Sequence, residues 1–376
     1  MFRLIYRQLI YSPLRTGLTT AALAAVIAVI LVLEGFDRGL VAQSRQLVLE
    51  RQADLIVTQA GISNMHAARS ILPQFARQEV EAVDGVAIAH PLTGILAIYE
   101  QGDRRTPVYL LVYDTAGGPR RIIAGGQPTA SRDIVVDRSL ARRYGLEPGD
   151  PFVLSDFEFR IAGITKGDTA LLTPVGFLRF DGLLDFYFES DLAADISTFP
   201  LLSFLLIELE PGADRDEVAK RVRALVPAGG VFLPEQLADN DASLVRVMFG
   251  PVFVLLVSVA YLTGVLVAAI IMFAAVLARR RGFGVLKALG FSSVFLTRAV
   301  VLEAAVLTLI AIPAGMAFAA AIGTVVEVAM PLYLVRSLEP VPVLRTAIGA
   351  LGFAVLGALA PMPLIHRVEP AIAFRS

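Results

Sequence analysis

The stretch VMFGPVFVLLVSVAYLTGVLVAAIIMFAAVLA, residues 247–278, runs for 32 residues without an ionisable side chain. A bilayer core about 30 Å thick needs about 20 helical residues at about 1.5 Å each, so a helix of this length, about 48 Å, projects beyond the lipid. Three further uncharged runs cover residues 16–33, 304–326 and 346–365. Together these runs predict four membrane-spanning helices.

The composition agrees with a membrane protein. Hydrophobic residues make up 56% of the 376-residue chain and charged residues 18%, against about 45–50% apolar and about 25% charged in ordinary soluble domains. This excess excludes a simple soluble enzyme. Cysteine is absent, so a disulfide framework, a thiolate metal site and a cysteine nucleophile are excluded as well.

The distribution of charge predicts the topology. Basic residues without acids precede the first run and fill residues 279–298, which places both segments in the cytoplasm. Residues 34–246 carry 21 basic and 30 acidic residues, a net charge of −9, as expected of a translocated domain. The predicted segments are a cytoplasmic amphipathic N-terminal segment (1–15), a first span (16–40), an extracytoplasmic domain (41–246), a second span (247–278), a cytoplasmic segment (279–298), a third span (299–326), a short extracytoplasmic loop (327–345), a fourth span (346–365) and a cytoplasmic tail (366–376). The first run is too long for a signal-peptide core and lacks a cleavage site, so we interpret it as an anchor.

The extracytoplasmic domain combines strand and helix patterns. Short β-branched or aromatic runs bounded by Gly, Pro or Asp predict strands at residues 53–59, 93–100, 106–114, 133–137, 157–164 and 202–210. Apolar residues at spacings of three and four predict helices at 72–83 and 213–226. Residues 38–51 and 234–246 have helical composition and continue the first and second spans as a stalk. The predicted fold is an α-helical membrane domain of four transmembrane helices, with an α+β extracytoplasmic domain inserted between helices 1 and 2.

Three stretches resemble a known family. Residues 133–165, DIVVDRSLARRYGLEPGDPFVLSDFEFRIAGIT, are similar to an extracytoplasmic signature of strand, capped helix, Gly-x-x-x-Gly-Asp turn and hairpin. Residues 279–304, RRRGFGVLKALGFSSVFLTRAVVLEA, are similar to the cytoplasmic segment before the third span, and residues 366–376, HRVEPAIAFRS, to the C-terminal tail. The chain thus resembles, over nearly its whole length, the permeases that include MacB, FtsX, LolC and LolE, the type VII ABC transporters. The early GFDRGL and ADLIV segments are most similar to DevC-type exporters.

The resemblance implies that the cytoplasmic segment docks onto a nucleotide-binding subunit. Its Val285, Leu286 and Leu289 form an apolar stripe on a short basic helix, as docking into a groove requires. Glycines at 282, 284 and 290 are expected to allow tight turns at both ends of this helix. A solvated loop is the alternative, and Phe283 stands near the position where the family often has an acid. The expected coupling residues are Arg279, Arg280, Arg281, Gly284, Val285, Leu286, Lys287, Ala288, Leu289 and Gly290.

Three residues of the third span are expected to have structural roles. Glu303 follows Arg298 by five residues, near the cytoplasmic interface, and we expect it to bridge the span to the coupling segment rather than to relay protons. Pro313 is expected to kink the helix. Gly315 and Ala319 suit close helix packing, either between protomers or within the chain.

The sequence carries no recognisable catalytic motif. A phosphate-binding loop needs a lysine that follows a glycine and precedes a serine or threonine, and none of the three lysines does so. The chain is therefore not expected to hydrolyse ATP. The three histidines lie far apart and lack the spacing of a zinc site. We therefore predict a non-catalytic subunit with no cofactor, metal or nucleic acid of its own, and ATP and Mg²⁺ are bound by a partner ATPase.

Three functions are compatible with the sequence. The leading prediction is an ABC permease subunit in a bacterial cytoplasmic membrane, both termini inside, which drives export or extraction of a lipid, a lipoprotein or a small hydrophobic or peptide substrate. By resemblance its partners are an ABC ATPase, a second copy or a related permease, membrane lipids and, for DevC-like exporters, a periplasmic membrane-fusion protein. One alternative is an FtsX-like regulator of a cell-wall hydrolase that transports nothing. Another is an ATP-independent receptor or scaffold.

Overall fold

A computed structural model describes residues 13–66, 69–73, 75–154, 156–189, 202–227 and 229–367. Most of the predicted amphipathic segment and of the predicted tail lies outside these residues. The chain divides into two compact units. The first, here called the helical unit, comprises residues 1–38, 249–326 and 335–376, and the second, the sheet unit, comprises residues 39–248 and 327–334.

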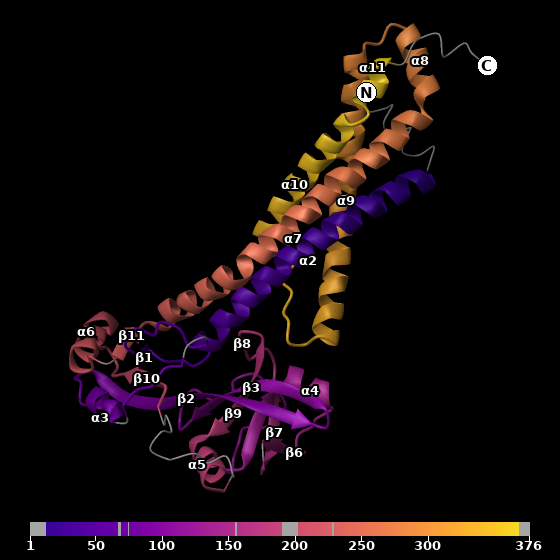
Figure 1. Ribbon diagram of the computed structural model, residues 1–376. Helices are drawn as coiled ribbons and strands as arrows, with labels where there is room; N and C mark the ends of the chain where they lie inside the picture. Colours follow the sequence, from indigo (N-terminus) through magenta and orange to yellow (C-terminus); the bar gives the residue numbers. More distant parts are fainter. Residues whose placement is uncertain are drawn as a thin grey trace. The chain divides into compact units, whose positions relative to one another are not determined.

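Among the described residues, four helices are long and apolar enough to cross a membrane. They are α2 (Pro13–Leu49), α7 (Pro234–Ala278), α9 (Ser293–Ala329) and α10 (Pro340–Leu359), the last followed by the short α11 (Met362–Arg367). Two of them, α7 and α10, begin at a proline, which is favoured at the first helical position because it has no N–H to leave unpaired. Figure 1 traces α2 and α7 as unbroken ribbons. The predicted continuation of the first two spans as helix is therefore confirmed.

Small residues bring the helices of the helical unit close together. A Cβ added to Gly315 of α9 would lie 2.7 Å from the side chain of Ile27 and 3.0 Å from the carbonyl oxygen of Ala24, both on α2. A Cβ on Gly357 of α10 would lie 2.6 Å from Ala268 of α7. The core between these helices is made of buried alanines and larger aliphatic residues such as Leu307. Gly315 thus serves packing within the chain, one of the two roles left open by the sequence.

The ends of two helices differ from the prediction. The third helix begins at Ser293, inside the predicted cytoplasmic segment, after a turn at Gly290. The fourth begins at Pro340, since proline is favoured in the first turn of a helix, and it includes Arg345, which is mostly exposed and forms an ion pair with Glu34. It also ends at Leu359, ahead of Pro361, since proline removes a helical hydrogen bond and disfavours helix in the residue before it.

The described residues of the sheet unit form eleven strands. Their order is β11-β1-β10-β2-β3-β9-β5-β7-β4, with β6 paired to β7 and β8 to β9. The pairing is mostly antiparallel, but β3 with β9 and β5 with β7 are parallel. The bounds are β1 (Leu55–Gln59), β2 (Val86–Gln101), β3 (Arg104–Tyr113), β4 (Ile122–Gly125), β5 (Asp133–Asp137), β6 (Pro151–Leu154), β7 (Phe157–Thr165), β8 (Thr169–Ala170), β9 (Thr173–Arg179), β10 (Phe204–Leu209) and β11 (Gly229–Phe232).

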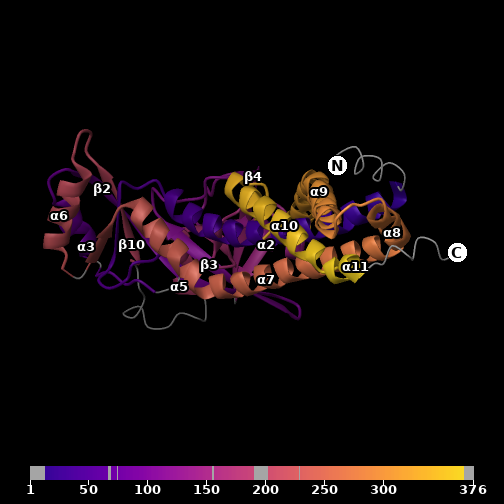
Figure 2. The same ribbon diagram turned by 90° about the horizontal axis from the view of Figure 1, so that it is seen from above.

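Four helices cover parts of this sheet. They are α3 (Ala76–Glu81), α4 (Arg138–Tyr144), α5 (Phe180–Glu189) and α6 (Arg215–Leu225). The pair α3 and α6 lies together beside β1 and β10 in both views, and its buried residues form one core with these strands (Figures 1 and 2). A second core, under α4 and α5, is built from β3, β5, β6 and β7. The domain is therefore α+β, as predicted.

Local sequence explains the predicted signature of residues 133–165. The Asp137 side chain accepts from the Ser139 N–H and caps α4, and Gly145 ends the helix with φ 66, a left-handed conformation that glycine adopts without strain. The strands β6 and β7 then form the predicted hairpin. All six predicted strands are present, and the predicted helix 213–226 is confirmed as α6. The predicted helix 72–83 is reduced to α3.

Candidate functional site

The predicted coupling segment forms a short helix, α8 (Arg280–Ala288), that follows α7 after a single residue. Two polar contacts hold it at its ends. Arg279, which precedes α8, donates to both carboxylate oxygens of Glu303 on α9, one of them at 3.0 Å. Lys287 in its last turn donates to the carbonyl oxygen of His366 on α11 at 3.1 Å. The helix is thereby fixed to two other helices of the helical unit.

The side chains of α8 divide into an inner and an outer face. Phe283 and Gly284 are buried, and Leu286 packs against the core of the helical unit. The outer face consists of Arg281, Val285, Ala288 and Leu289, at helical spacings of four, seven and eight residues, and these side chains are exposed. The predicted stripe is therefore split, because Leu286 packs against the core of the helical unit whereas Val285 and Leu289 are exposed. The exposed fraction of Leu289 is 71%.

Two of the three glycines of this segment have different roles from those predicted. Gly282 and Gly284 lie inside α8, so neither makes a turn before it. That turn is made by Arg279, with φ −106 and ψ 12. Gly290 does make the predicted turn after the helix, with φ 92. Arg280 is exposed beside the outer face.

The three predicted residues of the third span all lie within α9. Glu303 is buried, 7% exposed, and its pair with Arg279 provides the contact expected between the span and the coupling segment. Gly315 packs against α2, as described above. Pro313 lies in the interior of the helix, where it lacks a hydrogen-bond donor.

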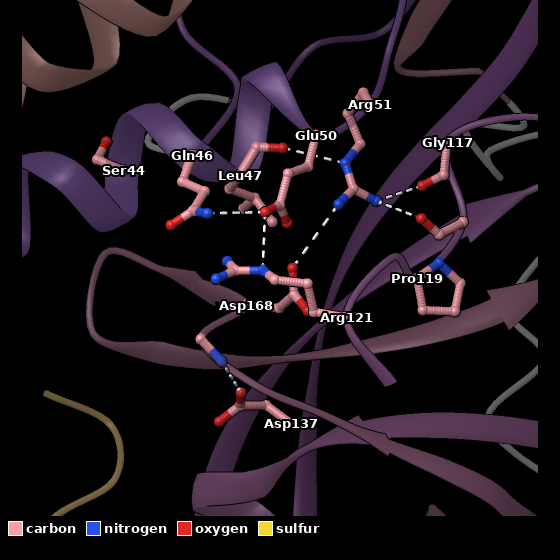
Figure 3. A network of polar contacts seen from close by, with 12 residues as sticks. Ser44, Gln46, Leu47, Glu50, Arg51, Gly117, Pro119, Arg121, Asp137 and Asp168 are labelled. Carbon is pink, nitrogen blue, oxygen red and sulfur yellow. Dashed lines mark hydrogen bonds and ion pairs between the residues drawn. The ribbon is translucent and has the colours of Figure 1, made fainter. Parts of the chain in front are cut away.

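A second polar cluster, in the sheet unit, was not predicted. It surrounds Arg51, two residues beyond the end of α2, whose side chain is fully buried (Figure 3). Arg51 Nε donates to the Leu47 carbonyl at 3.0 Å, and Nη1 donates to the carbonyls of Gly117 and Gly118, the latter at 3.0 Å. Nη2 lies 3.7 Å from the Asp168 carboxylate.

Neighbouring residues extend this cluster. Glu50 forms an ion pair with Arg121 at 2.8 Å and accepts from the Gln46 side chain at 2.8 Å (Figure 3). The Arg51 guanidinium lies 4.9 Å from the centre of the Phe177 ring, a cation–π distance. Burial raises the pKa of Asp168 to about 6, although the charge of Arg51 opposes this shift. Two ion pairs thus join the end of α2 to the sheet unit. Glu50 supplies the negative charge to the loop before β4, and Arg51 supplies the positive charge to the loop before β8.

A third set of contacts links α2 to α7 within the sheet unit. His66 is buried, and its Nε2 lies 3.2 Å from the Ser44 carbonyl of α2 and 3.6 Å from the Asp241 carboxylate of α7. The same carboxylate accepts from the N–H of Met65 at 3.0 Å. Burial lowers the pKa of His66 more than Asp241 raises it, so the ring is neutral at neutral pH. No group of three or more metal-ligating side chains occurs among the residues that the structure describes.

No sequence motif near Arg51 or Asp168 indicates that the two residues form a pair. Arg51 and Asp168 stand 117 positions apart in the sequence and follow unrelated motifs. A basic residue just beyond a helix end is common at surfaces, where it interacts favourably with the last carbonyls. Sequence reasoning therefore had no ground to separate Arg51 from the other arginines of the domain.

The comparisons with known proteins agree with this architecture. The family of the MacB-like periplasmic core domain matches residues 17–225, and that of the FtsX-like permease C-terminal matches residues 254–370. Two uncharacterised ABC transporter permeases of Mycobacterium tuberculosis are similar to the chain. One is 25% identical over 372 residues and the other 25% identical over 379 residues, and each alignment covers 98% of this chain and 95% of the relative.

Two solved structures are similar to about half of the chain. The periplasmic region of MacB from Actinobacillus actinomycetemcomitans is 9% identical, with a TM-score of 0.34 and coverage of 50% of this chain and 91% of that one. The extracellular domain of the ABC-type transporter YknZ from Gram-positive bacteria is 12% identical, with a TM-score of 0.35 and coverage of 47% and 98%.

Four apolar helices with an α+β domain between the first and the second define a multi-pass membrane protein of the permease class. The chain belongs to the family of MacB- and FtsX-like ABC transporter permeases. The predicted fold class and resemblance are confirmed.

Proposed function

We propose that the chain is the permease subunit of an ABC transporter in which the outer face of α8 docks onto a separate ATPase subunit. The exposed Val285 and Leu289 supply an apolar contact, and Arg281 beside them supplies positive charge. The contacts from Arg279 to Glu303 and from Lys287 to His366 hold this face in place, so force applied to it reaches α9 and α11 directly. This arrangement of α8 is the observation that carries the proposal.

The proposed output is movement of the sheet unit on the far side of the membrane. The helix α7 is 45 residues long, about 68 Å, and α2 is 37 residues long. Both lead from the membrane spans into the sheet unit without interruption, as a lever between the two sides requires. The proposed topology follows from the basic segments, because cytoplasmic loops carry an excess of Lys and Arg. Both termini and α8 lie in the cytoplasm of a bacterium, and the sheet unit lies outside the cytoplasmic membrane.

The proposed substrate class is a lipid, a lipoprotein or a small hydrophobic or peptide molecule. The four uncharged runs of 18 to 32 residues provide little polar material for a hydrophilic channel. Transfer driven by the sheet unit or lateral handling of a lipid fits this composition better than conduction of a polar solute. The proposed assembly contains two permeases, identical or related, over two ATPase subunits, with membrane lipids around them and a membrane-fusion protein outside.

The test is co-purification of the detergent-solubilised chain with the ATPase encoded beside it. The substitution Leu289→Asp places a charge on the outer face of α8 without touching the core, and should abolish co-purification. Leu225→Asp is the matched control, because Leu225 is also an exposed leucine (48%) on a helix, α6 of the sheet unit. Leu286→Asp is unsuitable, since it would disrupt packing inside the helical unit.

If wild type and Leu225→Asp retain the ATPase and Leu289→Asp loses it while remaining folded, α8 is the docking site. If wild type binds no ATPase, the proposal fails, and an ATP-independent receptor or scaffold becomes the better account. The FtsX-like regulator shares the ATPase but differs outside the membrane, so a cell-wall hydrolase captured by the sheet unit in place of a transported substrate would favour it. No observation on the described residues favours the regulator at present.

A further inference from the structure

A buried arginine, Arg51, lies two residues beyond the end of α2 in the sheet unit. Arg51 has the largest side chain among the fully buried residues that the structure describes, with an exposed fraction of 1%. Removing a guanidinium from water costs several kcal/mol unless it is paired and hydrogen-bonded. A buried arginine at this position therefore needs an explanation beyond the solvation of a helix end.

The contacts of Arg51 join one helix to three parts of the sheet unit. Its Nε satisfies the carbonyl of Leu47, one of the last four in α2, which have no partner within the helix. Its other nitrogens reach the loop before β4, at Gly117 and Gly118, and the loop before β8, at Asp168. The guanidinium also lies on the Phe177 ring of β9. No aliphatic side chain can make these contacts together.

The adjacent pair adds a constraint on rotation. Glu50 and Arg51 are consecutive and opposite in charge, and each takes a partner of the other sign, Arg121 and Asp168 respectively. Turning α2 about its axis would separate both pairs at once. Figure 3 shows the two pairs side by side at the end of the helix.

Besides the packing of Leu47 and Val48 in the core of the sheet unit, a short chain segment joins α2 to the sheet. Only Gln52, Ala53 and Asp54 separate Arg51 from the start of β1, and Gln52 has φ 52, a left-handed conformation that a non-glycine residue adopts at a cost. Without side-chain contacts such a link would behave as a hinge.

We propose that Arg51, with Asp168 as its counter-ion, is a positioning residue that fastens the end of α2 to the sheet unit so that the two move as one body. The inference rests on the proposed function, in which α2 carries movement. In this proposal, Arg51 transmits rotation or translation of α2 to the sheet. A purely stabilising role would leave the stalk and the sheet aligned when the pair is replaced by apolar residues of similar size.

The chain contains no cysteine, so two introduced cysteines can be spin-labelled in the full-length protein in lipid nanodiscs. Leu49→Cys places one label on the exposed last residue of α2, and Asp103→Cys places the other in the exposed turn between β2 and β3. The test variant is Arg51→Met with Asp168→Leu, because a buried ion pair replaced by apolar residues often leaves a protein as stable as before. The control is Arg221→Met, which removes the surface pair with Asp84.

In wild type and Arg221→Met we expect one narrow distribution of label distances, unchanged when the partner ATPase is trapped with a nucleotide. In the double variant we expect the distribution to widen by several Å, since three flexible residues span about 10 Å, while the unfolding temperature stays close to that of wild type. A narrow distribution in the folded double variant, or a wild-type distribution that changes with nucleotide, overturns the proposal.

If the double variant does not fold, Arg51→Lys takes its place. Lysine keeps the charge but as a compact group it cannot reach Gly117, Gly118 and Asp168 together, so the distribution should again widen, and a narrow one overturns the proposal. The label distances can be measured without the ATPase, so they test the role of Arg51 alone. The proposed function is tested by co-purification, and it fails if the wild-type chain retains no ATPase. Failure of one proposal can therefore be told from failure of the other.

Discussion

Arg279 and Glu303 form a two-pronged ion pair between the residue that precedes α8 and the buried side of α9. A guanidinium and a carboxylate in this geometry define an orientation as well as a distance, because both hydrogen bonds fail if either group turns. The pair therefore sets the direction in which α8 leaves α7. Since the exposed face of α8 is the proposed docking surface, Glu303 is linked to docking although it is itself buried.

Substitution of Glu303 by Leu should destabilise the helical unit. Removing one partner of a buried pair costs about 3–5 kcal/mol, and we expect about 1–3 kcal/mol here because the Arg279 side chain is a quarter exposed to solvent. Thermal unfolding in detergent measures this loss. The double variant Arg279→Met with Glu303→Leu should recover most of it, and a double variant no more stable than the single one would contradict the pairing.

Asp133, at the start of the predicted signature, should stabilise the sheet unit at neutral pH. Burial alone would raise its pKa, but hydrogen bonds from the N–H groups of Ala130 and Thr129 and from Arg160 lower the pKa to about 2. The stabilisation is present above pH 3.8 and is lost as the pH falls through 2. We expect Asp133→Asn to lower the free energy of unfolding at pH 7 by about 1–2 kcal/mol. Arg160→Met removes the two side-chain N–H donors but leaves the backbone donors of Thr129 and Ala130, and should cost less. An equal or larger loss would show that the backbone donors contribute little.

Asp168 should give the stability of the sheet unit the opposite dependence on pH. Because burial raises its pKa to about 6, the folded protein binds more protons than the unfolded chain between pH 3.8 and 6. The free energy of unfolding contributed by this group therefore falls as the pH rises through that window. Unfolding temperatures of wild type and Asp168→Asn, measured from pH 4 to 7, should diverge across it. His66 titrates in both proteins and cancels in the comparison, so a constant difference would contradict the raised pKa.

Gly315 should tolerate no larger residue, although alanine normally favours helices. An added Cβ would lie 2.7 Å from Ile27 and 3.0 Å from the Ala24 carbonyl, so α9 and α2 would have to separate. Gly352 of α10 has no atom within 4 Å of the same position, and it provides the matched control. We expect Gly315→Ala to lower the unfolding temperature in detergent, and Gly352→Ala to leave it unchanged or raise it by the equivalent of up to about 1 kcal/mol. Equal effects of the two substitutions would refute close packing at Gly315.

Elements that depend only on neighbouring residues could be predicted from the sequence. The strand at 133–137 is predicted to the residue, because a β-branched run stands between two aspartates and the second caps the next helix. The long helices follow from uncharged runs, but their ends do not. Arg345 ends the uncharged run from which the fourth span is predicted, yet it lies within α10 and donates a hydrogen bond to Glu34, 311 positions away. No inspection of residues 340–345 alone could show this.

Elements and contacts that depend on distant partners were missed or misjudged. The strand β11 contains two glycines in four residues and is stabilised by pairing with β1, not by its own propensity. The spacing of the apolar residues 285, 286 and 289 is compatible with a single stripe. In the structure, Leu286 packs against the core of the helical unit, whereas Val285 and Leu289 are exposed. Arg51 and Asp168 belong to the same class of relationships, since only the fold brings them together.

The pairing of β1 with β11 has a mechanical consequence. The helix α2 leads into β1, and β11 leads into α7, and the two strands lie antiparallel with Val57 opposite Val231. Any sliding of one stalk helix along the other must therefore shear this ladder. Since β11 is only four residues long and forms the edge of the sheet, it is the weakest link in that path. We therefore expect the ladder between β1 and β11 to separate before the rest of the sheet when one stalk helix is displaced along the other.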